Sequence, residues 1–216
     1  MKFDFRNLTD ELEHAHSSRI ALRPVSLADA WPIFEASRNE RFNQHLLWPQ
    51  PKDEDEVLTR LKTIAVASRK GDMAGVSAVV KKTGEFISLF KFQSHATRQD
   101  AIEMGVWTHD KFWHGRYSLE LGRLCVSAAF SLSNVQALVG AASPENRSSC
   151  KLMQAVGMEP LSLTLRESEK GNPVLLQEYV IGRSAWVQSH STAFGLFRPL
   201  VPLAASQPRE PVNEPA

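Results

Sequence analysis

The chain has 216 residues, of which 43% are hydrophobic and 23% are charged. This composition is typical of a globular domain. The formal net charge is +1, which gives no uniform field for nucleic acid or an anionic membrane. No apolar run approaches the roughly 20 residues needed to cross a bilayer. We therefore expect neither nucleic acid nor a membrane as a partner.

The cysteines and the start of the chain favour a cytoplasmic protein. Cys125 and Cys150 have no partner at metal-ligand spacing, so we expect two reduced thiols and no bound metal. The polar start has no apolar core of a signal peptide. We interpret residues 1–18 as a polar leader, residues 19–187 as one domain and residues 188–216 as a proline-rich, partly disordered tail.

The domain is predicted to begin with one strand and two helices. The stretch 19–26 contains the strand, which ends at Pro24. Residues 26–39 form a helix with Ser26 as its N-cap. Residues 55–71 form the second helix, which ends at a glycine. Its apolar face is predicted to consist of Leu58, Leu61, Ile64 and Ala65.

The middle of the chain is predicted to form three consecutive antiparallel strands. Residues 75–82 and 85–95 are two strands joined by a tight turn at a Thr-Gly pair. Residues 100–109 form the third strand. Alternation of side chains places Ile102, Met104 and Val106 on one face of this strand and Glu103 on the other.

The second half of the domain is predicted to form a helix, a strand, a helix and a hairpin. Apolar residues recur with helical spacing over residues 117–129, and residues 134–143 form a buried strand. Residues 144–158 form a short helix with Asn146 as N-cap and a glycine just beyond its end. Residues 161–186 form the closing hairpin.

The turn before the helix at residues 117–129 has features of an anion-binding site. Unpaired backbone N–H groups at a helix start can bind a phosphate, and a glycine lets the backbone approach closely. His114 and Arg116 could add positive charge to the N–H groups of this turn. A single glycine before a helix is also typical of an ordinary turn, so these residues leave both interpretations open.

Three further features have a functional and a structural interpretation. Asn146 and Ser149 could bind a ligand or cap a helix. Glu103 could act as a base or be an ordinary exposed strand residue. The acidic run at residues 53–56 could attract a cationic amine or simply favour the start of a helix.

Taken in order, these features resemble the GNAT superfamily of N-acetyltransferases, in the branch of the Rim-type ribosomal-protein N-terminal (alanine/serine) acetyltransferases. The similarity is carried by residues 20–39, 101–130 and 134–158. The last segment is the most specific, because family members commonly have Asn–x–x–Ser, a short helix and then a glycine. The resemblance implies an α/β (α+β) fold with a central, mixed, mostly antiparallel sheet that splays open and is flanked by helices.

The resemblance also implies a site. Acetyl-CoA would lie in the splayed gap as co-substrate, with its pyrophosphate on the turn and its pantetheine arm along the preceding strand. The residues implied to bind it are Val106, Trp107, Thr108, His114, Gly115, Arg116, Tyr117, Ser118 and Asn146. Glu103 matches a glutamate that acts as general base, and Ser149 matches a serine that protonates the leaving thiolate.

The chain departs from the family pattern at two places. The family turn usually has an aromatic residue, then Trp–Gly–x–Gly, then a small residue two positions on. Here His114 and Arg116 stand at the glycine positions, and Ser118 stands at the small one. Arg116 could compensate by contacting phosphate directly. Met158 stands where an aromatic residue is common, which we interpret as a packing change.

We therefore predict an acetyl-CoA-dependent N-acetyltransferase. Its acceptor would be a primary amine, either a protein N-terminus or a small molecule, and the enzyme would be a monomer or a homodimer. The chemistry requires a base for the amine and a donor for the oxyanion. The altered glycines favour an alternative, a catalytically impaired domain of the same fold that binds CoA or a protein, whereas Glu103, Asn146 and Ser149 argue against it.

Overall fold

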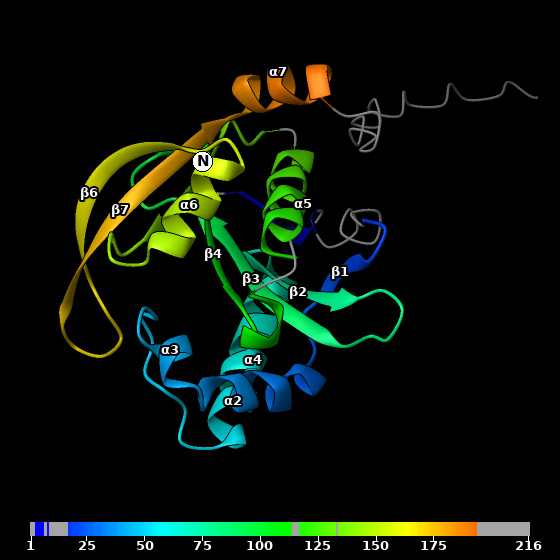
Figure 1. The fold of residues 1–216 in the computed structure, drawn as a ribbon, viewed down its shortest axis with the longest axis vertical. Helices are drawn as coiled ribbons and strands as arrows, with labels where there is room; N and C mark the ends of the chain where they lie inside the picture. Colours follow the sequence, from blue (N-terminus) through cyan, green and yellow to red (C-terminus); the bar gives the residue numbers. More distant parts are fainter. Residues whose placement is uncertain (1–2, 7, 9–16, 114–116, 133, 194–216) are drawn as a thin grey trace, which may run out of the picture.

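The computed structural model describes residues 3–6, 8, 17–113, 117–132 and 134–193, which form one sheet with helices on both faces (Figure 1). The sheet has seven strands in the order β1-β2-β3-β4-β5-β7-β6. They are β1 (Ile20–Pro24), β2 (Met73–Val80), β3 (Phe86–Ser94), β4 (Ala101–Thr108), β5 (Ala137–Ala142), β6 (Glu159–Glu167) and β7 (Pro173–Gly182). Neighbouring strands are antiparallel except β4 and β5, which are parallel. The predicted mixed, mostly antiparallel sheet is confirmed.

The helices lie in two layers. They are α2 (Ala30–Ser37), α3 (Glu40–Asn43), α4 (Glu54–Lys70), α5 (Tyr117–Ser131), α6 (Arg147–Ala155) and α7 (Arg183–Ala193), with short 3-10 turns at Leu27–Asp29 and Asp110–Phe112. α2 and α4 cover one face of the sheet, and α5 and α6 cover the other (Figure 1). The prediction placed Arg183 and Trp186 in the hairpin, but both belong to α7. Arg183 ends the strand by donating to the carbonyls of Val135 and Phe130, at 2.8 and 2.9 Å.

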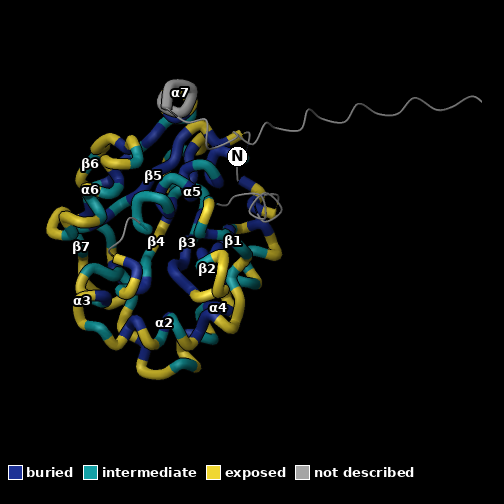
Figure 2. Tube along the Cα trace, turned by 45° about the vertical axis from the view of Figure 1, so that its right-hand side comes forward, coloured by how far each residue is buried: buried dark blue, intermediate teal, exposed yellow. Residues whose placement is uncertain are grey.

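Each face of the sheet has its own apolar core. Ile102 and Met104 pack toward α5, where Leu121, Leu124 and Cys125 are buried. On the opposite face, the buried residues of α4 pack against Phe86 and Leu89 of β3. Figure 2 shows the buried segments concentrated along the central strands. Alternation therefore turns successive side chains of β3 and of the first half of β4 toward opposite faces of the sheet.

The second predicted helix is confirmed as α4, with one change in its buried face. Asp53 accepts a hydrogen bond from the N–H of Glu56 at its start, and Gly71 ends it in the left-handed conformation with φ 77°. The buried residues are Val57, Leu61 and Ile64, whereas Leu58 and Ala65 are half-buried. α4 approaches β2 closely at Gly75, where an added Cβ would lie 2.2 Å from Cγ2 of Ile64.

The start of the chain contributes to the core. Phe3, Phe5 and Leu8 are buried, and the N–H of Phe5 donates to the carbonyl of Gly71 at 3.2 Å. The segment interpreted as a polar leader therefore packs three apolar side chains against the sheet. The division into leader, domain and tail stays a prediction, and residues 194–216 lie outside the described residues.

Candidate active site

The sheet opens between its two parallel strands. β4 pairs with β5 from Ala101 and Ala137 to Met104 and Gly140, and the pairing ends there. Beyond Met104, β4 continues along β3, while β5 continues along β7. The second half of β4 therefore has a strand partner on one side only.

Val106 and Thr108 direct their backbone groups into this opening. The N–H of His109 donates to the carbonyl of Ile87 in β3 at 2.8 Å. Backbone groups alternate in direction along a strand, so those of Val106 and Thr108 point away from β3. The carbonyl of Thr108 accepts a hydrogen bond from the indole of Trp113 at 2.7 Å, and the backbone of Val106 is left to pair with a ligand.

Trp107 contributes mainly its side chain. Its backbone groups point toward β3, by the same alternation. Its ring lies on the face of α2 and α4, where it packs edge-on against Phe42 with the ring centroids 5.0 Å apart. A second contact joins it to Phe86, with the centroids at 5.5 Å. Trp107 thus forms part of the wall on the side opposite α5 and α6.

The start of α5 follows β4 along the chain, as predicted. Of the turn implied to bind pyrophosphate, His114, Gly115 and Arg116 lie outside the described residues. Tyr117 and Ser118 form the first turn of α5 and are half-buried. The first N–H groups of any helix have no partner within it, which suits them to bind an anion.

Arg19 supports the first turn of α5. Its guanidinium carbon lies 4.0 Å from the centroid of the Tyr117 ring, and its Nε donates to Glu120 at 2.7 Å. Tyr117 also packs edge-on against Phe112, with the centroids 5.1 Å apart. The beginning of this helix is therefore held by contacts with the residue before β1 and with the segment that follows β4.

The start of α6 lies at the end of β5, on the other side of the opening. Asn146 caps the helix as predicted, because its Oδ1 accepts the N–H of Ser149 at 3.2 Å. The hydroxyl of Ser149 is half-buried and makes no side-chain hydrogen bond within the described part of the chain. Ser149 therefore has a hydroxyl available for a ligand in the first turn of a helix.

Glu103 is held by an arginine that the sequence analysis did not single out. The Nη1 of Arg166, on β6, donates to Glu103 at 2.5 Å, and its Nη2 donates to Glu178, on β7, also at 2.5 Å. The Glu103 side chain is 15% exposed. Burial opposes the charge of Arg166, but the bonds to the two carboxylates raise the pKa of Arg166 above its ordinary value. Two carboxylates and one guanidinium leave this cluster with one net negative charge.

The alternation of polar residues and leucines along β6 is a sequence signal for this cluster, but the polar residues, and not the leucines, face inward. Along β6, Ser162, Thr164 and Arg166 alternate with leucines. Alternation normally turns the leucines toward the core. Here Leu161, Leu163 and Leu165 are 43%, 59% and 70% exposed, and the polar residues face Glu178. The polar half of the alternation is therefore the half that faces the site.

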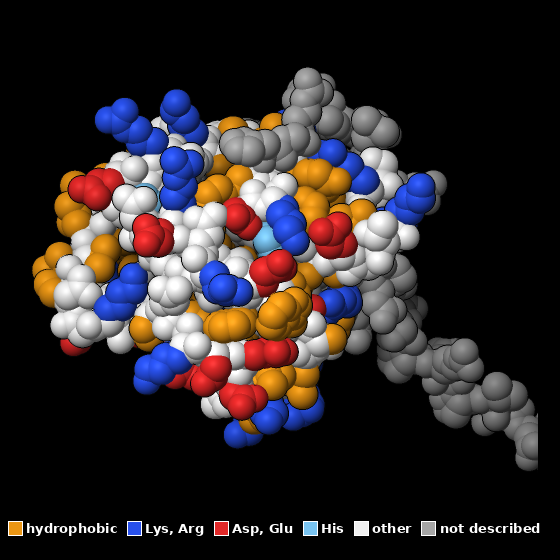
Figure 3. Space-filling view, turned by 60° about the horizontal axis from the view of Figure 1, so that its bottom comes forward, with side chains coloured by type: hydrophobic (Ala, Val, Ile, Leu, Met, Phe, Trp, Pro, Cys, Tyr) orange, Lys and Arg blue, Asp and Glu red, His pale blue; other side chains and the backbone are white. Residues whose placement is uncertain are grey.

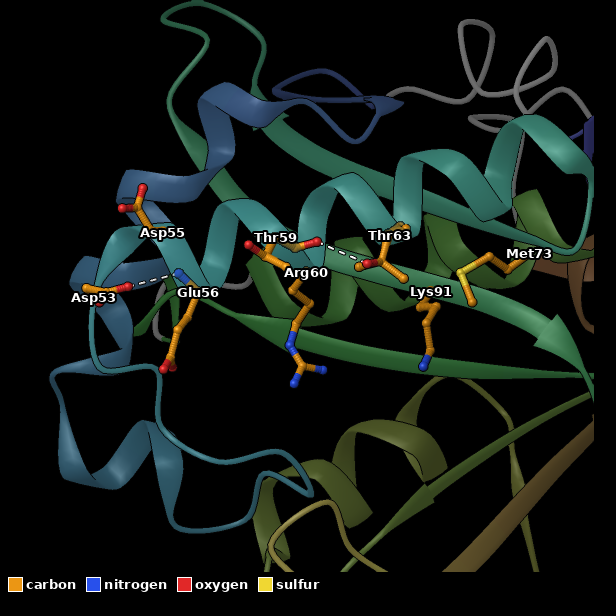
Figure 4. Close-up of a pocket in the computed structure, with 9 residues that line it drawn as sticks. Asp53, Asp55, Glu56, Thr59, Arg60, Thr63, Met73 and Lys91 are labelled. Atoms are coloured by element: carbon orange, nitrogen blue, oxygen red, sulfur yellow. Dashed lines mark hydrogen bonds between the residues drawn. The ribbon is translucent and has the colours of Figure 1, made fainter.

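A cavity of about 680 Å³ lies on the same face as Glu103, beneath α4. Its lining residues are Asp53, Asp55, Glu56, Thr59, Arg60, Thr63, Ile64, Met73 and Lys91. Glu56, Arg60 and Lys91 extend into one space, whereas Asp55 points away from it (Figure 4). Lysine and arginine side chains are interspersed with acidic ones on the side of α2 and α4, so no single sign of charge covers it (Figure 3).

The tip of the β6–β7 hairpin approaches this cavity. Glu169 accepts two hydrogen bonds from Arg60, at 3.2 and 2.6 Å, and its N–H donates to the carbonyl of Leu47 at 2.8 Å. The bond from Arg60 is the main cause that lowers the pKa of Glu169, and the charge of Lys91 adds to it. The hairpin tip and α4 are therefore joined by an ion pair next to Lys91.

The sequence-based expectations also concern the cysteines, possible metal ligands and long apolar helices. Both cysteines are free, and burial raises the pKa of the Cys125 thiol well above its ordinary value. Among the described residues, no group of three or more His, Cys, Asp or Glu side chains could hold a metal ion. No helix in the described ranges is long and apolar enough to cross a membrane.

Comparisons with known proteins agree with this geometry. The family model described as an acetyltransferase (GNAT) domain matches residues 19–159. An uncharacterized N-acetyltransferase p20 from Bacillus licheniformis is 22% identical over 169 residues, which are 78% of this chain and 94% of that protein.

Solved structures share the fold. RimJ from Mycobacterium smegmatis, in complex with CoA-disulfide, has a TM-score of 0.64 at 18% identity, over 76% of this chain and 82% of its own. The ribosomal-protein-S5-alanine acetyltransferase from Vibrio fischeri has a TM-score of 0.63 at 13% identity, over 79% of this chain and 97% of its own. At such identities, the likeness concerns the arrangement of the strands and helices.

Proposed function

The chain belongs to the GNAT acetyltransferase family, whose co-substrate is acetyl-CoA, and from this premise we propose that it acetylates a primary amine on a protein N-terminus or a small molecule. The observation that carries the proposal is the end of the β4–β5 pairing at Met104 and Gly140. The proposal is supported by the carboxylate of Glu103 on β4 and by the hydroxyl of Ser149 at the start of α6, which makes no side-chain hydrogen bond within the described residues. These are the groups that direct acyl transfer to an amine requires.

The proposed place of acetyl-CoA is the opening between β4 and β5. The pantetheine amides would pair with the backbone of Val106 and with the N–H of Thr108, which point away from β3. The pyrophosphate would bind the first N–H groups of α5, at Tyr117 and Ser118, together with the sequence-predicted turn of His114, Gly115 and Arg116. Trp107 and Asn146 would border the thioester end.

The proposed reaction is a direct attack without a covalent enzyme intermediate. The amine nitrogen forms a bond to the thioester carbonyl carbon, and the C–S bond breaks. Glu103 takes the proton that the amine loses, and Ser149 gives a proton to the departing thiolate. The proton count closes when Glu103 returns its proton through solvent and Ser149 regains one. An acceptor that arrives as an ammonium ion releases one further proton to solvent.

Arg166 fits this role for Glu103 as a positioning residue. A glutamate side chain has three rotatable bonds and can turn its carboxylate away from a substrate, and the guanidinium of Arg166 fixes one of its oxygens at 2.5 Å. The second oxygen makes no hydrogen bond within the described residues, so it is available to an amine or a bridging water. Glu178 completes the cluster by holding the other side of Arg166.

The test is a screen for release of the CoA thiol from acetyl-CoA, with a panel of free amines that includes short peptides with an unblocked N-terminus. We expect turnover with at least one amine and a loss of about 100-fold or more in Glu103→Gln, with acetyl-CoA affinity by calorimetry unchanged within about 2-fold. The matched control is Glu85→Gln, an exposed glutamate in the β2–β3 turn, which should keep full activity.

Two results would contradict the proposal. Binding of acetyl-CoA without release of thiol for any amine would mean that the chain does not acetylate amines. Full turnover in Glu103→Gln would mean that another group takes the proton. The second result would leave the reaction in place and remove only the role of Glu103.

A further inference from the structure

Lys91 stands on the floor of the cavity beneath α4, close to Glu103. It lies on β3 directly opposite Gly105 of β4, and Gln93 lies opposite Glu103. Side chains of directly opposed residues share a face of the sheet. Lys91 and Glu103 are therefore diagonal neighbours on one face, a relation that separates Cβ atoms by about 7–8 Å.

Along β4, no side chain stands between Lys91 and Glu103 on this face. The residue between them along β4 is Gly105, which is exposed although it lies within a central strand. A Cβ added at Gly105 would meet no atom within 4 Å. Among the described residues, the space directly above Gly105 is thus open, and Gly105 lies between Lys91 and Glu103 on this face.

Lys91 is the cation in this cavity that has no direct partner in the described part of the chain. It makes no hydrogen bond or ion pair there. The nearby Glu169 is engaged by both Nη atoms of Arg60. Glu56 accepts the N–H of Lys52 at 3.0 Å and lies 3.7 Å from its Nζ. Glu169 and Glu56 are therefore each engaged by a cation other than Lys91.

From this arrangement, which rests on the proposed function, we propose that the acceptor carries an anionic group that binds Lys91 while its amine is directed at Glu103. Lys91 is half-buried, and an ammonium ion without a partner in the described part of the chain favours a carboxylate or phosphate as its ligand. In this arrangement the amine is directed at Glu103 and not at the acidic run at residues 53–56, in which Asp53 caps α4 and Glu56 bonds to Lys52.

The test compares acceptors that differ by one negative charge, in a peptide arm and a small-molecule arm. The peptide pair is Ala-Asp-Ala-Ala-amide and Ala-Asn-Ala-Ala-amide, and the small pair is β-alanine and β-alaninamide. We expect wild type to prefer the anionic member of at least one pair by about 10-fold or more in kcat/KM. The arm that shows the preference tells whether the acceptor is a peptide or a small molecule.

Lys91→Gln should reduce this preference to within about 2-fold by slowing the anionic acceptor, with the neutral acceptor nearly unchanged. Lys91→Arg should keep much of the preference. The matched control is Lys82→Gln, an exposed lysine of the β2–β3 turn, which should behave as wild type. A wild type without preference in either arm, or a preference that survives Lys91→Gln, would overturn the inference.

A binding measurement separates this inference from the proposed function. The same acceptors are titrated calorimetrically into the chain saturated with CoA, in wild type and Lys91→Gln. Turnover of the neutral acceptor without a charge preference would refute the anionic site and leave the acetyltransferase. Charge-dependent binding lost in Lys91→Gln, but no thiol release, would support the anionic site and refute amine acetylation. Neither binding nor turnover of any acceptor would refute both.

Discussion

The two faces of the sheet around β4 are built in different ways. On the side of α5 and α6, the proposed cofactor groups are backbone N–H groups and helix starts, each formed within a short segment. On the side of α4, side chains from distant strands and a helix form the proposed acceptor site. Those side chains are Lys91, Glu103, Arg166 and Glu178, with Arg60 and Glu169 at the rim.

A local sequence pattern can specify a helix start, whereas the register of the sheet decides which side chains form a cluster. A helix start binds an anion through its backbone, whatever side chains surround it. A charged cluster depends on which residues the strand pairing places opposite one another. We call the face of α4 the acceptor side and the face of α5 and α6 the cofactor side. Substitutions can therefore change the chemistry of the acceptor side while the cofactor side is kept, and we predict that the two sides can be altered separately.

The largest expected effect comes from filling the open space at Gly105. Gly105 does not have a positive φ, and an added Cβ would meet nothing within 4 Å. We therefore expect the fold to tolerate a side chain at this position. Gly105→Leu would occupy the path between the cavity and Glu103. We expect kcat/KM for the acceptor to fall by about 100-fold or more, since small misplacements near the reacting atoms have effects of that order. Steady-state kinetics measure this.

The matched variant is Gly105→Ala, which adds one carbon and should lose less. Acetyl-CoA affinity by calorimetry should stay within about 2-fold in both variants, because the backbone of Val106 and Thr108 is untouched. If Gly105→Leu instead keeps acceptor turnover and loses acetyl-CoA binding, then Gly105 belongs to the cofactor side and the comparison of the two faces is wrong.

Sequence patterns predicted much of the cofactor side because its elements are local. The N-cap at Asn146, the strand at β4 and the helix from Tyr117 each follow from a few neighbouring residues, and all three are confirmed. The roles of these residues with acetyl-CoA stay predictions, including those of His114, Gly115 and Arg116. The family resemblance, in turn, implied the mixed, mostly antiparallel sheet that these elements form.

The acceptor side was not predicted because its contacts are not local. Arg166 lies 63 positions from Glu103, and the bond between them depends on β7 lying between β5 and β6. The leucines of β6 favoured the wrong face as the inner one, since the exposed side of this hairpin is the apolar side. Lys91 gave no signal, because a lysine on a strand is common and only its register with Gly105 places it near Glu103.

Removal of Arg166 should have a smaller effect, on stability. Arg166→Gln leaves Glu103 and Glu178 next to each other without their shared cation. The Arg166 side chain is 28% exposed, so we expect a loss of about 2 kcal/mol in the free energy of unfolding at pH 7, below the range for fully buried pairs. Urea denaturation measures it. Arg60→Gln is the control, because its pair with Glu169 is exposed and should contribute at most about 1 kcal/mol.

The pH dependence of this loss has a definite sign. Burial acts to raise the pKa of Glu178, but hydrogen bonds from Arg166 and Ser162 outweigh it and lower the pKa below the ordinary 4.5. A carboxyl group with a lowered folded pKa contributes stability above its unfolded pKa, and this contribution is lost as pH falls below about 4.5. The difference between wild type and Arg166→Gln should therefore shrink from pH 7 to pH 3. A difference that grows over this range would contradict the proposed cluster.

The smallest expected effect tests the cofactor side through one backbone group. Val106→Pro removes an N–H that points away from β3, so the β3–β4 pairing keeps its hydrogen bonds. We expect acetyl-CoA affinity to fall roughly 3- to 10-fold, the value of one hydrogen bond, while the melting temperature changes little. Val106→Ala keeps the N–H and should bind as wild type, whereas Trp107→Pro should destabilise the fold because its N–H faces β3. Undiminished binding in Val106→Pro would mean that acetyl-CoA does not pair with β4, and the backbone character assigned to this face would then rest on the start of α5 alone.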